Sequence, residues 1–129
     1  MSSVVQIFNE VRRLLDALPE VKVVGSRVSG DVAIFEIESH SASAALVVQQ
    51  LCEAANVSFE PAVRPHEPEL RGMAARVLSA STQGFDTIQY GNLQLLAIHL
   101  VWHLHGIGSI ETLVANEFLD TWHGARVGA

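Results

Sequence analysis

The stretch that most constrains the fold is residues 92–105, NLQLLAIHLVWHLH, whose apolar side chains point to nearly every side of a helical wheel. A helix that is apolar all round is normally buried among other elements. Its only polar stripe consists of Asn92, His99 and His103, whose spacings of seven and four residues place them on one face. The sequence therefore predicts a central buried helix with a single histidine stripe that faces water, polar partners or an ion.

The whole chain, residues 1–129, is expected to form a single domain, because 129 residues are enough for one core and hardly for two. Hydrophobic residues make up 49% of the chain, which supplies a core and argues against global disorder. Two prolines within residues 64–68, RPHEP, make a stiff, extended connector. This segment is the best candidate for a subdomain boundary.

The formal net charge is −6, and the acidic residues are dispersed along the chain. Residues 1–64 carry 8 acids and 5 bases, and residues 65–129 carry 6 acids and 3 bases. Affinity for nucleic acid comes largely from Lys and Arg on phosphates, so this charge argues against a nucleic-acid partner. It fits a basic protein partner and equally fits plain solubility.

The single cysteine, Cys52, excludes an internal disulfide and favours a reducing compartment. No His or Arg stands near it in sequence, so we expect a buried and unreactive thiol. The N-terminal arginine pair follows the apolar residues, the reverse of a secretory signal. The most apolar run, residues 93–104, is too short to cross a bilayer. These features predict a cytoplasmic protein with no membrane partner.

In the first half of the chain the spacing of apolar residues changes from helical to alternating, then back to helical and again to alternating. The predicted elements are a helix over residues 3–18, strands over 21–28 and 32–37, a helix over 43–55 and a strand over 57–63. Ser29-Gly30-Asp31 joins the first two strands as a hairpin. The second strand is apolar on both faces, so we place it centrally, with a packed layer on each side.

Local signals mark the ends of these elements. Ser3 can cap the first helix, Ser41 or Ser43 can cap the second, and Asn56 can end the second in a left-handed conformation. Pro61 has no amide hydrogen, so its strand belongs at a sheet edge. A strand, a helix and a strand in succession imply a parallel pair with a right-handed crossover. The first half is thus predicted as α-β-β-α-β with a mixed three-stranded sheet.

After Pro68 the apolar period is helical, which predicts a C-terminal group of three helices. The helix that begins at Pro68 has an apolar face made of Leu70, Met73, Ala74, Val77 and Leu78. The central helix begins near Asp86 or Asn92 and ends at Gly106-Ile107-Gly108, and residues 85–91 stay open between helix and strand.

The last helix is expected to be capped by Ser109, and the segment from Gly124 onwards is expected to fray. The core face predicted for this helix is Ile110, Leu113, Val114, Phe118 and Trp122. The predicted fold class is therefore α+β, with five helices and three strands, and with the strands confined to residues 20–64.

The residues that could carry chemistry are the histidines of the central helix. His99 and His103, four residues apart, have the spacing with which a helix presents two imidazoles to one metal. The sequence between them is LVW, so the glutamate of a zinc-protease motif is absent. Asp120 or His123 on the last helix would have to supply further ligands to zinc, iron or haem. We favour histidines satisfied by water or polar partners, with no metal cofactor, over a metal site or a proton-transfer role.

No other pattern amounts to a catalytic set. Ser109 lies outside a G-x-S-x-G context, and the glycines at positions 25 and 30 precede no helix that could hold a phosphate. The favoured function is therefore a small acidic cytoplasmic protein-interaction module, not an enzyme: an oligomeric adaptor, or an inhibitor or immunity-type protein that covers a protein partner. We expect a dimer or higher homo-oligomer. The alternative is a metal- or cofactor-binding protein that uses His99 and His103.

Overall fold

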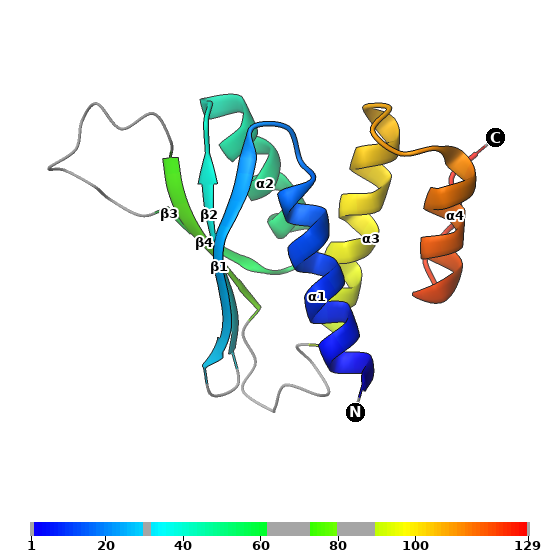
Figure 1. Ribbon diagram of the computed structural model, residues 1–129, viewed down its shortest axis with the longest axis horizontal. Helices are drawn as coiled ribbons and strands as arrows, with labels where there is room; N and C mark the ends of the chain where they lie inside the picture. The colour runs from blue at the N-terminus through cyan, green and yellow to red at the C-terminus, as the bar shows by residue number, and fades with distance from the viewer. Residues whose placement is uncertain (1, 30–31, 62–72, 80–89, 129) are drawn as a thin grey trace, which may run out of the picture.

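The computed structural model describes residues 2–29, 32–61, 73–79 and 90–128 of the chain. These residues form an α+β fold of four helices and four strands (Figure 1). In chain order the elements are α1 (Ser2–Asp16), β1 (Val21–Ser29), β2 (Val32–Ser39), α2 (Ala42–Ala54), β3 (Ser58–Pro61), β4 (Met73–Ser79), α3 (Tyr90–Gly106) and α4 (Thr112–Thr121). The predicted fold class is confirmed, whereas the predicted count of five helices and three strands differs.

The strands form one antiparallel sheet in the order β1-β2-β4-β3. Both β2 and β3 pair antiparallel with β4, so they run in the same direction, as the strand-helix-strand pattern predicts. They are not neighbours, because β4 lies between them. The predicted mixed sheet with an adjacent parallel pair is wrong for this reason. The edge position of β3, which carries Pro61, is confirmed.

The segment that the sequence misassigns is Met73–Ser79, predicted as part of a helix and found as the strand β4. Within it, Arg76 is exposed and Val77 is buried, which is the alternation of a strand. Ala75 has Ile37 of β2 on one side and Pro61 of β3 on the other. Pairing on both sides with segments distant in sequence overrides an apolar spacing that also suits a helix. The strands therefore extend beyond residues 20–64.

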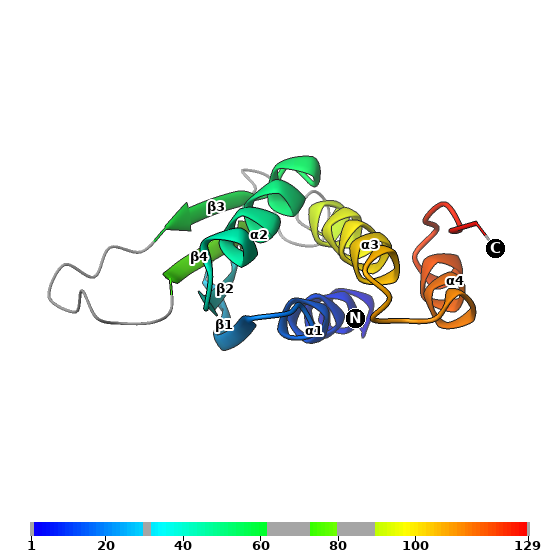
Figure 2. The ribbon, with the colours of Figure 1, turned by 90° about the horizontal axis from the view of Figure 1, so that it is seen from above.

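The helices α1 and α2 lie on one face of this sheet, and α3 packs against both of them (Figure 2). On the central strand β2, Phe35 and Ile37 belong to the core cluster that also contains residues of all four helices. Glu36 and Glu38 alternate with them and lie on the opposite face, where Glu36 pairs with Arg27 of β1 at 3.4 Å. The central position of this strand is confirmed. A packed layer on each of its faces is not found among the described residues, because the outer face carries charges.

The central element of the helical layer is α3, which packs against α1, α2 and α4. Its buried side chains are Leu93, Leu96, Ala97, Ile98, Leu100, Val101 and Leu104. Asn92, His99 and His103 are half-buried along the single polar stripe that the sequence predicts. Trp102 is half-buried as well, so α3 is not covered by other elements on every side.

Two helix ends are as predicted and one is not. The Oγ of Ser41 accepts a hydrogen bond from the N–H of Ala44 at 3.1 Å, which makes Ser41 the N-cap of α2. Asn56 follows this helix with φ of 59°, the left-handed conformation expected of it. In contrast, α4 has Glu111 as its N-cap, without a side-chain capping bond, so the predicted cap at Ser109 is wrong.

The buried face of α4 also differs from the predicted one. Of the five residues predicted for the core face, Trp122 is buried in the core, and Ile110 and Phe118 are half-buried against it. Leu113 and Val114, in contrast, are 68% and 51% exposed, and the structure buries Ala115, Asn116 and Leu119 instead. Alanine and asparagine are short, so this side of α4 approaches α3 more closely than a side with leucine and valine could. The side of α4 that carries Leu113 and Val114 is therefore exposed on the surface.

Several predictions fall outside the described residues. They are the boundary at 64–68, the helix start at Pro68, the ambiguous residues 85–89 and the hairpin tip at 30–31. The strands on either side of that tip do pair, with Ser29 opposite Val32. None of the helices that the structure describes is both long and apolar enough to cross a membrane.

Candidate functional site

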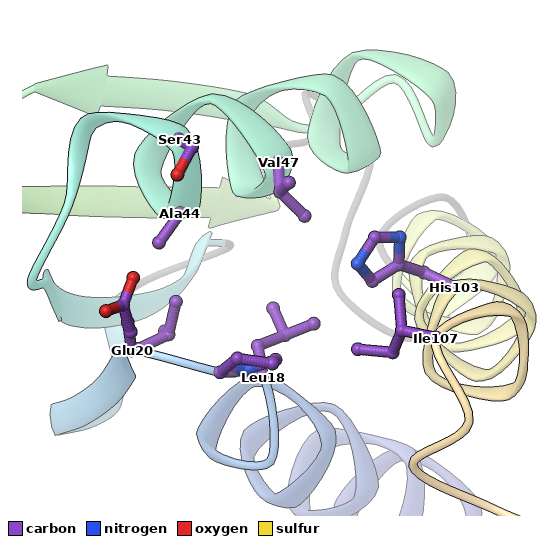
Figure 3. Close-up of a pocket in the computed structure, with 9 residues that line it drawn as sticks. Leu18, Glu20, Ser43, Ala44, Val47, His103 and Ile107 are labelled. Atoms are coloured by element: carbon purple, nitrogen blue, oxygen red, sulfur yellow. The ribbon is translucent and has the colours of Figure 1, made fainter.

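Three helix ends line an open cavity of about 230 Å³ beside α3 (Figure 3). Its walls are the turn after α1, the first turn of α2 and the last turn of α3. The lining residues are Leu18, Pro19, Glu20, Val21, Ser43, Ala44, Val47, His103 and Ile107. Most of these side chains are apolar, so the cavity has room for a small apolar group.

The turn after α1 is held in place by its backbone. Glu20 has φ of 61°, a left-handed conformation that is uncommon for a residue with a side chain. Its carbonyl accepts a hydrogen bond from the N–H of His40 at 2.8 Å. This bond ties the turn after α1 to the segment just before α2, and these two segments lead into two of the walls of the cavity.

The two predicted metal ligands on α3 have different surroundings. His103 points into the cavity, toward α2 (Figure 3). The ring of His99 lies 5.2 Å from the ring of Trp102, edge to face, with 86° between the planes. This edge-to-face contact holds the His99 ring against the indole.

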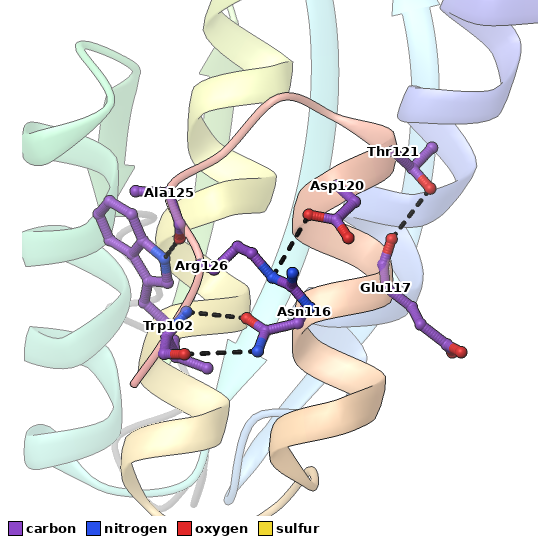
Figure 4. A network of polar contacts seen from close by, with 8 residues as sticks. Trp102, Asn116, Glu117, Asp120, Thr121, Ala125 and Arg126 are labelled. Atoms are coloured by element: carbon purple, nitrogen blue, oxygen red, sulfur yellow. Dashed lines mark hydrogen bonds and ion pairs between the residues drawn. The ribbon is translucent and has the colours of Figure 1, made fainter. Parts of the chain in front are cut away.

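The sequence suggests Asp120 and His123 as further ligands, but neither of them groups with the histidines of α3. Asp120 Oδ1 lies 3.6 Å from Nε of Arg126 (Figure 4). His123 is exposed and follows α4 with φ of 61°. Within the part of the chain that the structure describes, no three His, Cys, Asp or Glu side chains group closely enough to hold a metal ion. Among the described residues, therefore, no ligand set surrounds His99 and His103.

A polar network that the sequence does not predict joins α3 and α4 to the segment after α4 (Figure 4). The indole N–H of Trp102 donates to the carbonyl of Ala125 at 2.9 Å. The carboxamide of Asn116 accepts from the N–H of Val127 at 2.8 Å and donates to its carbonyl at 3.3 Å. Gly124, Ala125 and Val127 are therefore each held by a main-chain hydrogen bond, whereas the sequence predicts that the segment frays from Gly124.

One sequence signal for this network exists in retrospect. Asn116 lies on the buried side of α4, three residues before Leu119. A polar side chain that is buried there needs hydrogen-bond partners. The partners are main-chain groups of a segment with no periodicity of its own. Local patterns give no means of predicting their position.

Cys52 is fully buried in α2 and belongs to the core cluster. Burial, and to a smaller extent the negative charge of Glu53, raise the pKa of its thiol from 9.0 to about 12. The nucleophilic thiolate is thus disfavoured at neutral pH, in agreement with an unreactive cysteine.

On the outer face of the sheet, acids and bases pair across strands. Glu36 lies 3.4 Å from Arg27, and Glu60 of β3 accepts a hydrogen bond from Arg76 of β4 at 2.8 Å. Such exposed pairs contribute little to stability, on the order of 0–1 kcal/mol each. Their importance here is that they neutralise two of the acids on this face.

The remaining feature is an apolar surface on the outside of α4. Val114 and Phe118 lie four residues apart on α4, Leu113 adjoins Val114, and Ile110 lies just before the helix. Ile110 and Phe118 are half-buried and pack against the edge of the core, whereas Leu113 is the most exposed large apolar side chain among the described residues. We call these four residues the α4 apolar face.

Comparison of the chain with protein-family models, with curated proteins and with solved structures gives no match. The fold is that of an α+β protein with a four-stranded antiparallel sheet. Its candidate sites are the cavity beside His103, the α4 apolar face and the polar network around Asn116.

Proposed function

We propose that this protein is an interaction module that associates with a second copy of itself through the α4 apolar face. The observation that supports the proposal is the exposure of Leu113 and Val114, 68% and 51%, on a helix whose other side already packs on α3. A helix with one exposed face normally has charged or polar residues there. Two adjacent aliphatic side chains in that position are typical of a surface that another chain covers.

The position of α4 is suited to such an interface. It lies at the end of the molecule away from the sheet, with α3 on one side of it (Figures 1 and 2). Phe118, one of the four residues of this face, contributes an aromatic ring that lies 6.3 Å from the ring of Trp122. Aromatic and aliphatic side chains at the centre, with charged residues such as Glu117 at the rim, are the usual composition of a dimer interface.

Self-association is better supported than the role of an acidic inhibitor or immunity-type protein. Such a protein needs acids that are free to meet a basic partner. On the outer sheet face, Glu36 and Glu60 already pair with arginines of the same chain. The net charge of −6 then serves mainly solubility. We further propose a cytoplasmic location, supported by a single cysteine that is free and buried.

Light scattering of the purified full chain tests the proposed association. We expect a mass of twice the 14.0 kDa of one chain. Val114→Glu should return the protein to the mass of one chain, because a buried charge at an interface is unfavourable. Val28→Glu is the matched control, since Val28 is 53% exposed on β1, and it should leave the mass doubled. A wild-type chain that stays at the mass of one chain at high concentration contradicts the proposal.

A further inference from the structure

The segment after α4 occupies the groove between α3 and α4 in the manner of a bound peptide. Gln94 of α3 donates to the carbonyl of Trp122 at 2.6 Å. Trp102, eight residues further along the same helix, donates to the carbonyl of Ala125 at 2.9 Å. Asn116 of α4 bonds both the N–H and the carbonyl of Val127. Each of these contacts joins a side chain of α3 or α4 to the main chain of the segment, and Figure 4 draws those made by Trp102 and Asn116.

The Asn116 contact has the geometry of strand pairing. A side-chain amide that accepts from the N–H and donates to the carbonyl of one residue reproduces the two hydrogen bonds of an antiparallel partner. Asn116 is only 8% exposed, so without these bonds its buried amide would be left unpaired. The groove therefore needs an extended chain in it, but its hydrogen bonds do not depend on the side chains of that chain.

Shape supplies the sequence preference that the hydrogen bonds lack. A Cβ on Gly124 would lie 2.9 Å from Cδ2 of Leu119 and 3.0 Å from Cγ1 of Ile98, so the groove admits only glycine at this position without a shift. Three residues later, Val127 packs its side chain against the core. By contrast, a Cβ on Gly128 would meet nothing within 4 Å.

The other side chains of the segment are not selected. Ala125 and Arg126 are exposed, and the contact of Arg126 with Asp120 is an exposed pair at 3.6 Å. In an extended chain, the groove thus restricts the first position to glycine, leaves the next two positions unrestricted and contacts an aliphatic side chain at the fourth.

We infer that the groove between α3 and α4 is a recognition site for an extended peptide of the type glycine-x-x-aliphatic from a protein partner, and that residues 124–127 occupy it as an internal competitor. The competitor is covalently attached, so its effective concentration is high and a partner binds only when it displaces this segment. The site lies on the opposite side of α4 from the α4 apolar face and does not depend on self-association.

Full-length variants in which the internal segment is weakened test this inference. Gly124→Ala opposes Leu119 and Ile98, and Gly128→Ala is the matched control. The probe is a labelled synthetic peptide with the sequence of residues 123–129, HGARVGA, followed by fluorescence anisotropy. We expect the peptide to bind the Gly124→Ala protein at least about tenfold more tightly than the wild type or Gly128→Ala protein.

Two further arms identify the groove as the binding site. A peptide with alanine in place of its glycine should not bind, and Asn116→Ala introduced with Gly124→Ala should abolish binding. Leu113→Glu introduced with Gly124→Ala should leave binding unchanged, because Leu113 lies outside the groove.

Val127→Asp is a second way to release the internal segment, in case Gly124→Ala leaves it bound or unfolds the chain. Circular dichroism establishes that each variant is folded. The inference is overturned if neither release variant binds the peptide. It is also overturned if the alanine peptide binds as well as the glycine peptide, or if binding persists without Asn116.

Discussion

The ring of Phe8 on α1 lies 4.8 Å from the ring of Phe35 on β2, with 31° between their planes. Phe35 is fully buried in the central strand, and Phe8 is half-buried on the helix that covers it. Aromatic pairs at this separation add on the order of 0.5–1.5 kcal/mol beyond the area that they bury. The contact positions α1 over the sheet, and α1 in turn packs along α3.

Two neighbouring leucines of α3 should respond differently to truncation. Leu96 is fully buried, so Leu96→Ala should lower the free energy of unfolding by about 2–5 kcal/mol. Leu95 is 39% exposed, and Leu95→Ala should cost less than about 1 kcal/mol. Urea denaturation of both variants measures the difference. Equal effects would mean that α3 does not lie in the core as described.

The N-cap of α2 gives a prediction that separates two serines. Ser41→Ala removes the acceptor for the N–H of Ala44 and should cost about 1 kcal/mol of stability. Ser109→Ala should change stability by no more than about 0.5 kcal/mol, because Glu111, not Ser109, is the N-cap of α4. Thermal unfolding of the pair tests this, and a larger loss for Ser109→Ala would restore the cap that the sequence suggested.

Cys52 should make stability depend on pH in the alkaline range. Its pKa is about 12 in the folded protein and 9.0 without burial, so above pH 9 the unfolded chain releases a proton that the folded chain keeps. The unfolded state then binds fewer protons, and the free energy of unfolding falls as pH rises from 9 toward 12. Below pH 9 this contribution is constant.

Comparison of wild type with Cys52→Ala in urea at several pH values isolates the effect, because other titrating groups are common to both. The variant should show the shallower alkaline decline. A thiol reagent at pH 8 should modify the wild-type cysteine only as fast as the protein unfolds. Rapid modification of the folded protein would contradict the burial of Cys52.

The histidine pair should be dispensable. His99→Ala combined with His103→Ala removes a ring in edge-to-face contact with Trp102 and a ring that lines an apolar cavity, so we expect a modest loss of stability and no loss of bound metal. Elemental analysis of untagged wild-type and variant protein checks this. A stoichiometric zinc or iron signal in the wild type that disappears in the double variant would favour the metal-binding function over the interaction module.

The parts of the fold that the sequence predicts are those that local rules govern. The apolar spacing of α1 and α3, the hairpin of β1 and β2, the cap at Ser41 and the left-handed Asn56 each depend on residues within one or two turns. The half-buried histidine stripe of α3 follows from the same periodicity. Of the candidate sites, only this stripe was predictable, and the structure groups no ligand set around it among the described residues.

What only the tertiary structure decides is which elements meet. Met73–Ser79 is a strand because β2 and β3 supply hydrogen-bond partners on both of its sides. The buried side of α4 is chosen by the close approach that Ala115 and Asn116 allow toward α3, which leaves Leu113 and Val114 outside. The segment after α4 is ordered because Trp102 and Asn116 bond its main chain. These outcomes depend on free-energy differences between competing contacts over long sequence separations, and a local pattern of side chains contains no record of them.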